Sequence, residues 1–168
     1  ALILAVRRGY IDIVSALLAD ERVDPNCNDQ GNRALIWAAC RGFIDIVRFM
    51  LADKRIDPNH ADKYGRTALI DAAFHGHGDI VNMLLADERI DPNHNKHGNT
   101  ALYLAADKGH SDIVRALLTD PRVDPNHTDE DDDTALILAA WGGRAAIVNI
   151  LLADERIDPN HADVYGNT

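Results

Sequence analysis

The tripeptide Asp-Pro-Asn recurs along this chain at a nearly constant period. Successive copies lie 33 or 34 residues apart, and they begin at Asp24, Asp57, Asp91, Asp124 and Asp158. A period of this length is typical of a solenoid, in which each repeat is one supersecondary unit that packs on its neighbours. The spacing divides the 168 residues into a single array of five repeats, approximately 1–33, 34–67, 68–100, 101–134 and 135–168.

Each repeat contains two segments with the apolar spacing of a helix. In residues 78–85, for example, Ile80, Val81 and Leu84 recur on one stripe of a 3.6-residue period. A glycine such as Gly76 separates the first segment from the second, and a proline such as Pro92 ends the second. The sequence therefore predicts an all-α solenoid of stacked helix-turn-helix repeats with β-hairpin connections.

Residues 62–85, DKYGRTALIDAAFHGHGDIVNMLL, carry a pattern that resembles the ankyrin repeat, and similar phrases cover essentially the whole chain. The resemblance implies protein binding by a concave face, which the hairpin tips and the exposed ends of the first helices line. The family's TPLH phrase usually contributes a histidine, whereas that position here is Ile36, Ile70, Tyr103 or Ile137. We expect apolar packing to replace the hydrogen bonds of that histidine. The connection LLADERIDPN is also longer than the family's and lacks its glycine, which predicts a different cap for the second helix.

Composition narrows the classes of partner. The chain has 17 Lys plus Arg and 27 Asp plus Glu, and its net charge of -10 disfavours nucleic acid and anionic lipid and favours a neutral or basic protein. No apolar run approaches the roughly 20 residues of a membrane span, so membrane insertion is not expected. Two cysteines, Cys27 and Cys40, are too few for a disulfide framework and favour a reducing, cytoplasmic location.

No residue pattern indicates catalysis, a cofactor or a bound metal, and an enzyme is not expected. The histidines that follow each Asp-Pro-Asn are one repeat apart, and packed helices lie about 8–10 Å apart, which is too far for a shared zinc ion. The acidic run from Asp129 to Asp133 lacks the central glycine and alternating ligands of a calcium loop. It is either a solvated tip or a contact for a basic partner.

Binding residues follow from the resemblance by position. The predicted partner-binding residues are Arg41, Lys63, Tyr64, Arg66, Phe74, His75, His97, Lys108, Asp131, Asp133, Trp141 and Tyr165. Aromatic anchors on a polar face are typical of binding centres, so Phe74 and Trp141 either contact a partner or pack on the neighbouring repeat. Trp37 has the same two interpretations. Asp71, at a position that is Leu in the next two repeats, is expected to pair with Arg41 or to be exposed.

The chain starts and ends within a repeat, and its final residues supply the hairpin strand that its first repeat lacks. It is either a window cut from a longer array or a block that continues end to end as a filament, which is extracellular in that interpretation. The expected junction residues are Ala1, Leu2, Ile3, Leu4, Tyr165, Gly166, Asn167 and Thr168. Asn126 begins an N-x-T glycosylation pattern, which matters if the protein is secreted.

Overall fold

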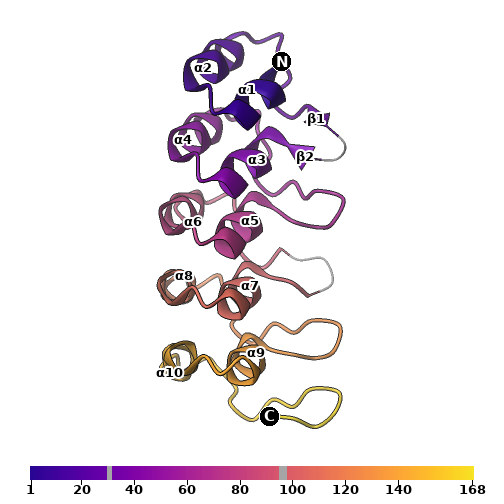
Figure 1. Ribbon diagram of the computed structural model, residues 1–168, viewed down its shortest axis with the longest axis vertical. Coiled ribbons are helices and arrows are strands. Elements are labelled where there is room, and N and C mark those ends of the chain that lie inside the picture. Colours follow the sequence, from indigo (N-terminus) through magenta and orange to yellow (C-terminus); the bar gives the residue numbers. More distant parts are fainter. Residues whose placement is uncertain (30–31, 95–97) are drawn as a thin grey trace.

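The computed structural model describes residues 1–29, 32–94 and 98–168, and ten helices follow one another in pairs along this part of the chain (Figure 1). The first helices of the pairs are α1 (Leu2–Arg8), α3 (Ala34–Arg41), α5 (Ala68–His75), α7 (Ala101–Lys108) and α9 (Ala135–Trp141). The second helices are α2 (Ile11–Ala19), α4 (Ile44–Ala52), α6 (Gly78–Leu85), α8 (Ser111–Thr119) and α10 (Ala145–Leu152). First helices pack on first helices and second helices on second helices, so the molecule is a two-layer stack with its termini at opposite ends (Figure 1). The predicted helical solenoid is confirmed.

Buried apolar residues run the length of both layers. Alanines such as Ala72 and Ala105 are completely buried in the first layer, where their small size allows neighbouring helices to approach closely. Val81 and Val114 occupy corresponding buried positions in the second layer. Three side chains at the family's histidine position are buried, and they are Ile36, Ile70 and Tyr103. Ile70 belongs to the apolar core as expected, whereas the hydroxyl of Tyr103 donates a hydrogen bond to Asp129.

Histidines elsewhere supply hydrogen bonds between repeats. The ring N–H of His110 donates to the backbone carbonyl of Phe74 (3.2 Å), and that of His77 donates to the carbonyl of Cys40 (3.1 Å). Gly76, which ends α5 at φ 81°, leaves the room that the His110 ring needs, because a Cβ there would lie 2.9 Å from the ring. The glycine is therefore required both by its backbone conformation and by the neighbouring repeat.

The connections between pairs are mostly loops. The first has a short antiparallel pair of strands, β1 (Asn28–Asp29) and β2 (Asn32–Arg33), and the fourth has a single bridge between Thr128 and Thr134. The remaining described residues of the connections form no strand, so β-hairpins are not a general feature here. An aspartate closes the tip instead. In the second connection, Asp62 Oδ1 accepts from the backbone N–H groups of Tyr64 (2.8 Å) and Arg66 (2.9 Å).

Among residues 1–29, 32–94 and 98–168, no helix has the length and apolar character that a bilayer crossing requires.

Candidate binding surface

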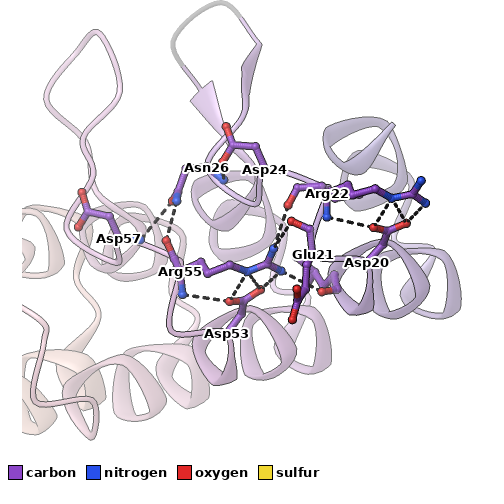
Figure 2. A network of polar contacts seen from close by, with 10 residues as sticks. Asp20, Glu21, Arg22, Asp24, Asn26, Asp53, Arg55 and Asp57 are labelled. Carbon is purple, nitrogen blue, oxygen red and sulfur yellow. Dashed lines mark hydrogen bonds and ion pairs between the residues drawn. The ribbon is translucent and has the colours of Figure 1, made fainter.

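An arginine clamped by an aspartate joins each second helix to the one before it. In the second repeat, Asp53 accepts two side-chain N–H bonds from Arg55, with Nη2 and Oδ2 2.6 Å apart (Figure 2). The same guanidinium donates to the carbonyl oxygens of Leu18 (2.9 Å) and Val23 (3.1 Å) in the preceding repeat. Because the last carbonyls of a helix have no intrahelical donor, this arginine satisfies acceptors that water would otherwise have to bind.

We call this arrangement the arginine staple. It recurs as Arg89 to the carbonyls of Leu51 and Ile56, Arg122 to Leu85 and Ile90, and Arg156 to Leu118 and Val123. The staple accounts for the different cap expected for the second helix. This contact was not predicted from the sequence, although an Asp-x-Arg pattern that indicates it occurs in each repeat.

A second contact, the asparagine bridge, connects the same repeats through the backbone of the staple arginine and of the Asp that follows it. The amide of Asn59 donates to the carbonyl of Arg89 (2.6 Å), and its Oδ1 accepts from the N–H of Asp91 (2.8 Å). Figure 2 shows the equivalent Asn26 between Arg55 and Asp57. Asn126 bonds Arg156 and Asp158 in the same way, so a sugar on its amide nitrogen would compete with a structural contact.

Most of the predicted binding residues belong to the last turns of the first helices and to the tips of the connections. We call these residues together the loop-side face. Three side chains, Arg7 of α1 and Trp37 and Arg41 of α3, form a stack there. The guanidinium carbons of Arg7 and Arg41 lie 4.8 and 5.7 Å from the centre of the Trp37 ring system. The predicted binding residue Arg41 therefore contacts Trp37, for which the sequence allowed either partner binding or packing on the neighbouring repeat.

A second group of cations surrounds Tyr64, whose side chain is 60% exposed. Lys63 Nζ lies 4.8 Å and the Arg66 guanidinium 5.4 Å from the tyrosine ring. Arg66 also pairs with Asp62 (2.9 Å) and contacts Asp71 (3.3 Å). Both expectations for Asp71 are therefore wrong, since it is buried at 2% exposure and its ion-pair partner is Arg66 rather than Arg41.

Phe74 and His75 lie together on the next part of this face. Their rings meet edge to face at 4.9 Å, and Lys108 Nζ from the following repeat lies 4.8 Å from the Phe74 ring. Phe74 is half-buried, whereas His75 is exposed. His75 Nε2 also lies 3.8 Å from the Cys40 thiol, whose pKa is raised by burial and by Asp71.

The loop-side face is acidic at its far end. Asp129 accepts a 2.5 Å hydrogen bond from the hydroxyl of Tyr103, and its other oxygen accepts from the backbone of Asp131 and Asp133. Partial burial, then the neighbouring carboxylates, raises the pKa of Asp133. Asp131 remains exposed.

The other predicted residues are more scattered. Trp141 at the end of α9 is 87% exposed and Tyr165 is 79% exposed, while His97 lies outside the described residues. Of the predicted junction residues, Leu2 and Ile3 are buried in the core of their own repeat, whereas Leu4 is 64% exposed. No group of three potential metal ligands occurs in residues 1–29, 32–94 and 98–168.

Helix pairs that stack in one direction and repeat their contacts at every step define a helical repeat solenoid. Comparison with protein families gives a match to ankyrin repeats (3 copies) over residues 2–96 and 88–163. The matched residues cover most of the chain, which therefore belongs to the ankyrin repeat family. A search of curated proteins found no match.

Proposed function

We propose that this chain binds a protein partner through its loop-side face and acts without catalysis. Ankyrin repeats are generally protein–protein interaction modules. The observation that carries the proposal is the row of cations placed over aromatic rings at Trp37, Tyr64 and Phe74. Arginine, tyrosine and tryptophan are the side chains most enriched at the energetic centres of interfaces, and here they lie on one face.

The partner is a whole protein of neutral or basic net charge, because the chain's own net charge of -10 opposes the approach of a strongly acidic one. Among the predicted residues, Lys63, Tyr64, Arg66 and His75 form the centre of the proposed contact. Trp141, Asp131, Asp133 and Tyr165 extend it toward the other end.

Affinity capture from the native cell extract, followed by chemical crosslinking, tests the proposal. We expect crosslinks from the captured protein to Lys63 and Lys108, and we expect Tyr64→Ala to weaken capture at least about tenfold, as for an interface centre. Phe49→Ala is the matched control, because Phe49 is an exposed aromatic residue on α4, in the other helix layer. Equal effects of the two substitutions, or crosslinks confined to Lys54 just after α4, would contradict the proposal.

A second candidate function is end-to-end stacking of copies into a filament, and the apolar end faces favour it. Ile13 is 49% exposed on α2, although the equivalent Ile46, Ile80 and Ile113 are 2–3% exposed where another repeat covers them. The Arg22 side chain, clamped by Asp20, is 90% exposed. A second copy that stacked on this face would bury Ile13 and offer Arg22 the helix-end carbonyls of a staple.

Light scattering and electron microscopy over a range of protein concentrations test the second candidate. Fibres that disappear in the Ile13→Asp variant but persist in Phe49→Asp would support stacking through the α2 face. A monomer at every concentration would eliminate this candidate, and it would leave the loop-side proposal unaffected.

A further inference from the structure

The loop-side face has opposite charge at its two ends. At the α1 and α3 end, the last helical turns carry Arg7, Arg8 and Arg41, and neither helix contains an Asp or Glu. At the α9 end, the fourth connection carries the acidic run from Asp129 to Asp133. The described part of this face is thus electrically polarised along the axis of the stack, in a molecule whose total charge is strongly negative.

The cationic end brings two arginines to one aromatic ring. Guanidinium groups from two different repeats lie over the indole ring of Trp37. A guanidinium that lies over an aromatic ring keeps its N–H groups directed outward in its own plane, where they match the two oxygens of a carboxylate. The Arg41 side chain is exposed and forms no hydrogen bond or ion pair with any residue that the structure describes, so its guanidinium N–H groups have no acceptor within that part of the chain.

The acidic end opposes the same ligand. The negative charges of Asp129, Asp131 and Asp163 all raise the pKa of Asp133, after the larger effect of its burial. Such a cluster of like charges repels any further carboxylate. A segment that places its acidic side chains over Trp37 gains charge-assisted hydrogen bonds, whereas the reversed placement puts them against this cluster. One placement is therefore favoured by attraction at one end and by repulsion at the other.

We propose that the partner contributes a segment with Asp or Glu side chains, and that these carboxylates bind Arg7 and Arg41 beside Trp37 at the α1–α3 end of the loop-side face. The proposal rests on the proposed function, and it names the chemistry of the bound segment and its position. A partner of neutral or basic net charge satisfies both requirements, because the carboxylates need to be concentrated only in the segment that makes contact. Long-range attraction and local recognition are then separate properties of the partner.

Selection from a random 16-residue peptide display library on the immobilised chain tests this inference. We expect the enriched peptides to carry Asp or Glu, and we expect Arg41→Gln and Arg7→Gln each to weaken their binding at least about tenfold. Arg48→Gln is the matched control, since Arg48 is an exposed arginine on α4 that pairs with Asp45 within its own helix. Binding that is lost equally in Arg48→Gln would overturn the inference, because bulk charge would then suffice.

The two tryptophans locate the bound peptide. Each gives one indole N–H signal in a nitrogen–proton correlation spectrum, and Trp37→Phe identifies which signal belongs to Trp37. An enriched acidic peptide should shift the Trp37 signal and leave that of Trp141 in place. Enriched peptides without acidic residues that still shift loop-side signals would overturn the carboxylate inference and support the proposed function. Enriched peptides that shift signals of the second helices alone would overturn both.

Discussion

Asp71 is a carboxylate buried in an apolar layer, and its ion pair with Arg66 is poorly bonded. Burial raises its pKa, and the positive charges of Arg66 and His75 oppose that rise only in part. The contact of Asp71 Oδ1 with Arg66 Nη1 is 3.3 Å and lacks hydrogen-bond geometry, so this oxygen has no hydrogen-bond donor among the described residues. A buried, poorly bonded charge destabilises the native state.

Replacing this carboxylate should therefore stabilise the chain. We expect Asp71→Leu to raise the free energy of unfolding by about 1 kcal/mol at pH 7, since Leu occupies the equivalent positions 104 and 138. Arg66 keeps its pair with Asp62. Because a raised carboxyl pKa destabilises the fold above that pKa, the gain should shrink as the pH falls and Asp71 becomes protonated. Urea titrations at pH 7 and pH 4 measure both effects, and a loss of stability in both Asp71→Leu and Asp71→Asn would contradict this account.

The aspartates that clamp the staple arginines have lowered pKa values, in contrast to Asp71. The Arg89 side chain holds the pKa of Asp87 below its ordinary value of 3.8. A lowered carboxyl pKa stabilises the fold above the unfolded value, and this stabilisation is lost as the pH falls through the folded value. We expect Asp87→Asn to be less stable than the wild type at pH 7, and the difference to shrink below about pH 3.8. A difference that is constant from pH 7 to pH 2.5 would show that the charge of Asp87 is not responsible.

At the scale of a single element, α3 differs at its N-cap from the three first helices that follow it. In α5, α7 and α9 a threonine hydroxyl accepts from a backbone N–H three residues further on, as Thr67 does from Ile70. Arg33 takes that place in α3, makes no capping hydrogen bond, and has a buried Nε without a hydrogen-bond partner among the described residues. Arg33→Thr should therefore stabilise the chain by about 1 kcal/mol, the ordinary value of such a cap. Thermal unfolding measures it, with Thr67→Ala as the control expected to lose a similar amount.

The helices were predictable from sequence because their determinants are local. The period of the apolar residues, the glycine after each first helix and the proline after each second helix act within a few residues of the element that they define. The arginine staple was not predictable in the same way. Arg55 reaches a carbonyl 37 residues earlier in the chain, and that contact exists only once two repeats are stacked. The group around Trp37 was missed for the same reason, since Arg7 belongs to the preceding repeat.

At the scale of the whole molecule, we expect the staples to make the unfolding of neighbouring repeats cooperative. Arg89 donates to carbonyls of the preceding repeat, whereas Arg22 bonds Asp20 alone among the described residues and has a side chain that is 90% exposed. We expect Arg89→Ala to lower the free energy of unfolding by about 2 kcal/mol, for the loss of charge-assisted hydrogen bonds, and to broaden the urea transition. Arg22→Ala should change stability by less than about 0.5 kcal/mol. Similar losses in the two variants would mean that the Asp–Arg pair, rather than the contact between repeats, provides the stability.

The staple and the asparagine bridge meet at one residue, since the side chain of Arg55 donates to the preceding repeat while its backbone carbonyl accepts from Asn26 of that repeat. The two rows of contacts therefore follow a single line along the stack. Bending that opens the stack along this line stretches both rows at once, whereas bending that closes it stretches neither. The molecule should therefore behave as a rod that resists bending in one direction more than in the opposite direction. A partner that curves the rod in the softer direction does so at little energetic cost.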